Sequence, residues 1–109
     1  MNVRALACAL LFLAACQAPA KISHVMTGHA ARAHQGPVAV HMEAEAVPPT
    51  FREIALVQAI TYGREADLPH VIGGLRERAA LLGCTTIVRV RIDQGQTSAS
   101  GSGVCGIVE

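Results

Sequence analysis

The chain of 109 residues has no excess of charge of one sign, because nine basic side chains stand against eight acidic ones. Nucleic-acid binding requires a concentration of positive charge that neutralises phosphates, so the composition argues against a nucleic-acid partner. Aromatic residues are scarce at 3%, and tryptophan is absent. This length allows one small domain at most, and a small domain with few aromatic side chains needs a further source of stability.

Recognisable catalytic motifs are also missing. The sequence contains no His-Glu-x-x-His zinc motif, no Gly-x-Ser-x-Gly nucleophile motif and no Walker phosphate-binding loop. The serine and glycine run at 98–103 could be taken for a phosphate cradle, but no helical pattern follows it to supply a dipole. The acidic residues are dispersed along the chain. We therefore expect a protein that is not an enzyme and uses no cofactor.

The apolar run near the N-terminus is too short for a membrane-spanning helix. It covers residues 5–15, follows a short segment with one positive charge at Arg4, and ends before polar Gln17. A spanning helix needs about 20 apolar residues, whereas this length is typical of the hydrophobic region of a secretory signal. We predict that residues 1–15 are a signal peptide that is removed, which leaves eight basic and eight acidic residues in 16–109.

Residues 13–16 read Leu-Ala-Ala-Cys and resemble the lipobox of bacterial lipoproteins. The resemblance implies that Cys16 becomes the N-terminus and that its thiol carries a diacylglyceryl group, which with N-acylation anchors the chain stably to a membrane. The residue after Cys16 is Gln17. In enteric bacteria an Asp at this position retains lipoproteins in the inner membrane. Because Gln17 is not Asp, the resemblance implies anchoring in the outer membrane, facing the periplasm. An ordinary signal cleaved after residue 18 or 20 is the alternative.

Residues 17–36 mix small and polar side chains without a period of 2 or 3.6. This composition predicts a flexible linker, so that 16–36 form a lipidated N-terminus and tether with a root-mean-square span of about 25 Å. An amphipathic helix lying on the membrane is the alternative. The globular domain is then expected over residues 37–109.

Two extended segments open this domain in the sequence pattern. Apolar residues alternate with polar ones from Val38 to Glu45, which predicts a half-buried strand that ends before Pro48 and Pro49. Residues 51–62 predict a second extended segment that ends at Gly63, although several good helix formers between 53 and 59 leave a helix open.

A helix is predicted next, from an N-cap at Asp67 with Pro69 in the first turn to a stop at Gly83. Its apolar stripe consists of Leu68, Ile72, Leu75, Ala79 and Leu82. Residues 85–92 then predict a β-branched strand whose outer face carries Arg89 and Arg91, and 99–108 predict a strand of small residues. The predicted fold is α+β, a small β-β-α-β-β domain with one helix packed on an antiparallel or mixed sheet.

If Cys16 carries lipid, Cys84 and Cys105 remain as a pair in the mature chain. A turn that pairs Ile92 with Thr97 would place them opposite each other and facing the helix. In an oxidising compartment this predicts a disulfide that closes a loop of about 20 residues and contributes about 3 kcal/mol. A redox couple lacks the usual Cys-x-x-Cys spacing, and two free buried thiols are the other alternative.

Imidazoles at His24, His29 and His34 recur every five residues and are candidate metal ligands. Steps of five share a face neither on a helix nor on a strand, so only a folded loop could bring them together. Incidental histidines in a polar linker are the preferred interpretation, and His70 is expected at the surface of the predicted helix.

The segments 51–55, 75–88 and 101–107 resemble small bacterial envelope lipoproteins of the RcsF-like group, which includes the stress-sensing lipoprotein of the Rcs pathway and whose fold is similar to YbjQ-like domains. The resemblance implies a tethered, non-catalytic binding, sensing or structural module of the cell envelope. Its sheet edge or its Arg89 and Arg91 face would meet an envelope protein or polymer. A periplasmic metal-binding or small-ligand-binding lipoprotein is the alternative, because YbjQ-like relatives are linked by name to heavy metals.

Overall fold

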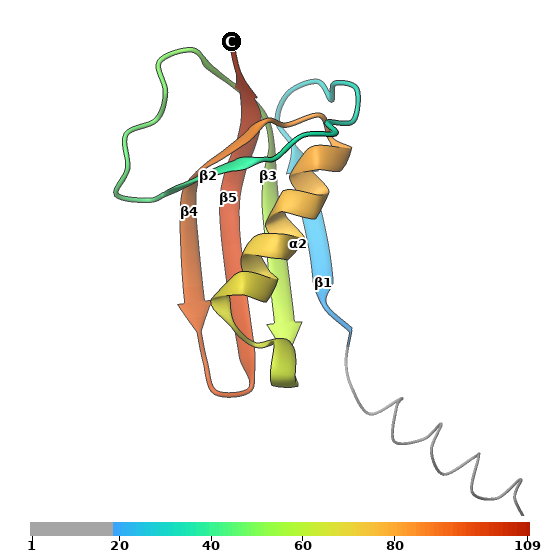
Figure 1. The fold of residues 1–109 in the computed structure, drawn as a ribbon, viewed down its shortest axis with the longest axis vertical. Helices are drawn as coiled ribbons and strands as arrows, with labels where there is room; N and C mark the ends of the chain where they lie inside the picture. The colour runs from blue at the N-terminus through green and yellow to red at the C-terminus, as the bar shows by residue number, and fades with distance from the viewer. Residues whose placement is uncertain (1–18) are drawn as a thin grey trace, which may run out of the picture.

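The computed structural model describes residues 19–109, which form one five-stranded sheet with a single α-helix packed on one face (Figure 1). The elements are β1 Lys21–Met26, β2 Ala39–Met42, β3 Phe51–Tyr62, the 3-10 turn η1 Gly63–Glu65, α2 Leu68–Leu81, β4 Thr86–Gln94 and β5 Ser98–Val108. The strand order is β1-β3-β5-β4-β2. All pairs are antiparallel except β2 with β4, so the sheet is mixed and the predicted α+β class is confirmed.

The predicted signal peptide, residues 1–15, and the predicted lipidation site Cys16 lie outside the described residues. Among residues 19–109, no helix has the length and apolar character needed to cross a membrane.

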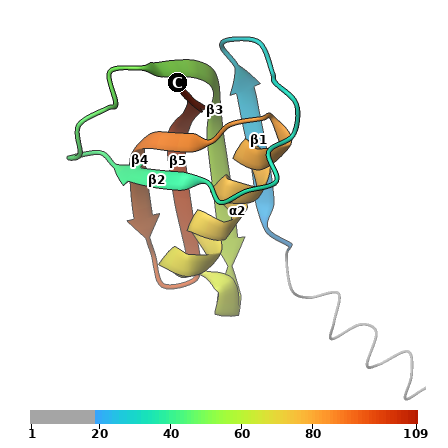
Figure 2. The same cartoon turned by 45° about the horizontal axis from the view of Figure 1, so that its top comes forward.

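The linker predicted over 16–36 is wrong for residues 21–26, which form β1 and pair with β3 from Lys21 opposite Ile60 to Met26 opposite Ala55. The connection from β1 to β2 is also held, because the Ala31 amide donates to the Leu82 carbonyl at 3.0 Å. Figure 2 shows this connection running past the C-terminal end of α2. An edge strand with only one packed face carries few apolar residues, so its period-2 pattern was too weak to detect.

Two segments predicted as extended are strands. Residues 51–62 form β3, and the helical alternative is wrong because alternate side chains, including Val57 and Ala59, are buried under α2. The strand predicted from Val38 to Glu45 is shorter, since β2 covers only Ala39–Met42 and its register on β4 shifts between Val40 and Met42. After that shift the chain turns away from the sheet.

The helix begins and ends where its caps predict. The Asp67 carboxylate accepts the His70 backbone N–H at 3.0 Å. At the other end Gly83 has a φ of 85°, and the Cys84 amide donates to the Ala79 carbonyl at 2.9 Å. These bonds satisfy helix-terminal groups in the manner of a Schellman motif, which needs a left-handed residue at the glycine position.

The buried stripe of α2 differs from the prediction at its start. Leu68 is 45% exposed, whereas Val71, Leu75 and Ala79 are fully buried. Val71 lies over β5, where a Cβ on Gly101 would stand only 2.5 Å from its Cγ1 atom. The missing side chain on Gly101 therefore lets the helix pack close to the middle of the sheet.

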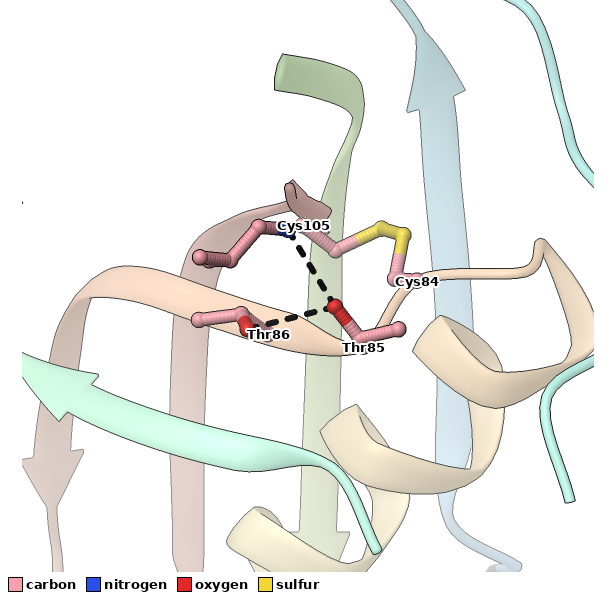
Figure 3. Close-up of a disulfide and its surroundings, with 5 residues drawn as sticks. Cys84, Thr85, Thr86 and Cys105 are labelled. Carbon is pink, nitrogen blue, oxygen red and sulfur yellow. Dashed lines mark hydrogen bonds between the residues drawn. A yellow bond between two sulfur atoms is a disulfide. The ribbon is translucent and has the colours of Figure 1, made fainter. Parts of the chain in front are cut away.

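The predicted disulfide between Cys84 and Cys105 is present, with the two Cα atoms 5.7 Å apart and both residues fully buried (Figure 3). The register used to predict it is wrong, because Ile92 pairs with Gly101 and Cys105 with Ile87. Cys84 instead reaches β5 from the connection between α2 and β4. The bond therefore joins the end of the helix to the central strand.

Candidate binding face

The sheet has one face covered by α2 and one that no helix of residues 19–109 covers, which we call the open face. The two views agree that α2 lies on a single side of the sheet (Figures 1 and 2). The core lies on the helix side and includes Leu75, Val57 and Ile87. Strand side chains alternate between the faces, so each strand also presents residues to the open face.

One row of apolar residues crosses the open face. Val25 of β1 pairs with Leu56 of β3, Leu56 pairs with Val104 of β5, and Val104 pairs with Val88 of β4. We call these four residues the apolar row. Val25 is 64% exposed and Leu56 45%, whereas Val88 is only 2% exposed. The row is thus open to solvent on the β1 and β3 side and covered at its β4 end.

The covered end lies beside a small cavity lined by Val47, from the connection between β2 and β3, together with Val88 and Val104. The uncovered part forms a depression of about 380 Å³, lined by Val25, Leu56 and Val104 of the apolar row. The neighbouring register positions are polar, since Ser23 pairs with Gln58, Gln58 with Ser102, and Ser102 with Arg91. We call these four residues the polar row. The open face therefore combines one apolar and one polar row.

A β-bulge brings Arg89 into this depression. The register of β4 on β5 shifts between Val88 and Arg91, and Arg89 has a φ of 54°. The extra residue breaks strict alternation, so Val90 enters the core while Arg89 lines the depression on the open face. Strict alternation from Arg89 and Arg91 would also place Ile87 on the outer face of the strand, but Ile87 is fully buried. No local sequence signal marks the bulge.

Arg89 and Arg91, the predicted partner-binding residues, are both exposed. Within residues 19–109, neither guanidinium group has a hydrogen bond or an ion pair, and no acidic side chain lines the depression. Arg52 and Arg76 are engaged, since Arg52 lies 3.5 Å from the Glu109 carboxylate and Arg76 donates to the Val38 carbonyl at 3.1 Å. Exposed Arg32 and Arg64 have no such bond among the described residues. The guanidinium groups of Arg89 and Arg91 therefore lack an ion-pair partner among residues 19–109, although Glu53 lines the small cavity beside Arg89.

The three candidate metal-ligating histidines are not brought together. The His24 Nδ1 atom lies 3.1 Å from the Arg78 guanidinium, which also donates to the Ile22 carbonyl at 2.9 Å. The His34 ring contacts the Pro37 carbonyl at 3.1 Å, and His29 is exposed. Over the part of the chain that the structure describes, no three His, Cys, Asp or Glu residues are grouped to hold a metal ion.

Among residues 19–109, Asp67 and His70 form the closest pair of titratable groups, with Oδ1 and Nδ1 2.6 Å apart at the start of α2. The His70 backbone N–H lowers the pKa of Asp67 from its usual value, and the His70 side chain lowers it further. Both side chains are exposed, and Asp67 has the geometry of a helix N-cap. The pair therefore stabilises the helix end, and His70 lies at the surface as predicted.

No family model matches this chain, and no curated protein matches it. Its fold is similar to the crystal structure of a Francisella virulence factor, FvfA, with a TM-score of 0.53. The two sequences are 17% identical, and the match covers 80% of this chain and 97% of that chain. At this identity the similarity shows a shared fold alone.

Proposed function

We propose that the protein is a bacterial envelope lipoprotein, tethered to the membrane through Cys16, that binds a partner through its open face and has no catalytic role. The observation that carries the proposal is the exposed apolar row beside two unpaired guanidinium groups, Arg89 and Arg91. Apolar patches that remain exposed on a small domain, rimmed by polar groups, mark interaction surfaces.

The disulfide supports an envelope location. Cys84 and Cys105 are fully buried and joined, and structural disulfides persist in oxidising compartments such as the periplasm. This agrees with the Leu-Ala-Ala-Cys motif at 13–16, which calls for export before lipidation.

The position of β1 shortens the proposed tether. β1 begins at Lys21, five residues after Cys16. Five residues span at most about 18 Å when fully extended, so the lipid would hold the β1 edge of the sheet close to the bilayer surface. The partner would then be an envelope protein or polymer that comes near that surface.

The intact mass of protein extracted from membranes tests the tether. We expect a chain that begins at Cys16 and carries acyl chains, with Cys84 and Cys105 alkylated only after reduction. A Cys16→Ala variant should be released from the membrane fraction. An unlipidated chain with free thiols would overturn the proposed location.

Site-specific photo-cross-linking in cells tests the binding role. A photo-reactive residue replaces Ser102, on the open face between two strands, and in a matched control replaces Glu77, exposed on α2. We expect a discrete cross-linked product from position 102 and none from position 77. Equal cross-linking from both positions, or none from position 102, would contradict a binding role for the open face.

A further inference from the structure

The depression on the open face joins an apolar wall to a single cationic group. Leu56, Val25 and Val104 supply the wall, and Arg89 is the charged side chain at its rim that points to the open side. Arg91 follows in the polar row, opposite Ser102. A ligand that fits must therefore offer apolar surface and negative charge within a short distance of each other.

We propose that the open face binds an acidic–apolar protein segment, a short stretch in which one or two carboxylates flank an apolar side chain. The apolar side chain lies against Leu56, and the carboxylates pair with Arg89 and Arg91. This proposal rests on the proposed binding role and names the chemistry of the partner. Guanidinium groups bind carboxylates through paired N–H donors, and complementary charge selects the correct partner.

The backbone of Arg89 supports a binding role for that side chain. Arg89 is the one non-glycine residue of 19–109 with a positive φ, at 54°. Left-handed backbone is unfavourable for side chains other than glycine, and such residues persist where the side chain is needed. Glycine would satisfy the bulge without this cost, so the bulge alone does not account for an arginine at this position.

The count of charges favours a protein segment over a lipid surface or an anionic polymer. Surfaces that bind anionic lipids carry clusters of about four to eight basic residues. The open face offers Arg89, Arg91 and Lys21, and acidic Asp93 shares that face two residues after Arg91. The uncovered part of the row crosses three strands spaced about 4.8 Å apart, so it is about 10 Å long and accommodates a short segment. Neither a polyanion nor a headgroup would use the exposed Leu56 side chain.

Selection from a library of random displayed dodecapeptides tests the proposal, with the full mature protein immobilised. We expect enrichment of sequences that place Asp or Glu next to large apolar residues. Affinity of the enriched peptides should fall at least about tenfold in Arg89→Gln and in Leu56→Ser, because each substitution removes one half of the recognised chemistry. Arg64→Gln, which removes an exposed charge from η1, is the matched control and should change affinity less than about twofold.

Three outcomes would overturn the proposal: no enriched peptide, enriched peptides without an excess of acidic residues, or binding unchanged by Arg89→Gln. Co-sedimentation with phosphatidylglycerol vesicles that depends on Arg89, in place of peptide binding, would assign the face to a lipid surface. Each variant must have a thermal unfolding midpoint close to that of the wild type.

The two proposals fail separately. A cross-link from position 102 without acidic enrichment would leave the binding role standing and reject the acidic–apolar segment. An unlipidated protein that still selects acidic–apolar peptides would reject the envelope tether alone.

Discussion

The two faces of the sheet use the same strands for different purposes. Leu56 and Val57 are neighbours on β3, yet Leu56 is 45% exposed on the open face whereas Val57 is buried under α2. On the helix side small residues and a disulfide pack tightly, and on the open side apolar and cationic groups remain without partners in residues 19–109. Stability therefore depends on the covered face, and the open face is free to carry binding groups.

The largest difference between the faces should appear on truncating one leucine from each. Leu75→Ala empties a fully buried site and should lower the free energy of unfolding by about 2–5 kcal/mol. Leu56→Ala should cost less than about 1 kcal/mol, because its side chain is already half exposed. Urea denaturation of both variants measures the contrast. Equal losses would mean that the open face is covered in solution.

Removing the disulfide should weaken the covered face next. Cys84→Ala/Cys105→Ala releases a loop with a sequence separation of 21 and should lower the free energy of unfolding by about 3 kcal/mol. For a domain of this size the melting temperature should fall by about 12–24 °C. Circular dichroism of the double variant and of reduced wild type should give the same midpoint. A fall of less than about 4 °C would show that helix packing alone holds Cys84 in place.

A substitution on the open face should raise stability. Arg89→Gly relieves a left-handed side-chain cost of about 1–2 kcal/mol, while the extra chain entropy lost on folding costs about 0.5–1 kcal/mol. A net gain of up to about 1.5 kcal/mol is expected. The same variant should lose the peptide affinity described above. Denaturant midpoints compared with those of Arg64→Gly provide the measurement. A loss of stability in Arg89→Gly would indicate that the arginine supports the fold.

The smallest effect concerns acid stability at the start of α2. The lowered pKa of Asp67 means that its ionised form is favoured in the folded state. The stabilisation of the folded state by ionised Asp67 is fully present above the unfolded pKa of about 3.9. It is lost as the pH falls through the lower pKa that Asp67 has in the folded state. Asp67→Asn keeps a good N-cap residue but removes the titration. Its unfolding midpoint should decline less steeply than that of wild type between about pH 5 and pH 2. An identical dependence on pH in the variant and the wild type would contradict a stabilising role for ionised Asp67.

Local signals predicted most of the fold. Asp67 and Gly83 marked the helix ends because capping depends on side-chain oxygen and left-handed backbone, which are properties of single residues. The strand near 86–94 followed from a β-branched, alternating run. Residues 51–62 were predicted as extended without clear alternation and with a helix left open, and they form a strand. The pairing of Cys84 with Cys105 was predicted from the count of cysteines, although through a register that the sheet does not use.

Non-local packing decided what the pattern missed. β1 exists because residues 21–26 find an unpaired edge on β3 and a helix residue, Arg78, that holds Ile22 and His24. The sequence of residues 21–26 alternates only weakly between apolar and polar residues, so these contacts cannot be predicted from it. The candidate site also depends on non-local packing. The sequence pattern placed Arg89 and Arg91 on an outer face, but it did not predict the depression beside them.

The sequence by itself determined strands β2 to β5, α2 with its caps, the disulfide pair and the two exposed arginines, because each depends on interactions between residues close in the chain or on residue type. It did not determine β1. Only the tertiary structure decided which apolar residues stay exposed. Val25, Leu56 and Val104 come from three strands, and their row forms because pairing aligns them and α2 packs on the other face. The β4 bulge then points Arg89 at that row, which a period of two along the chain cannot specify.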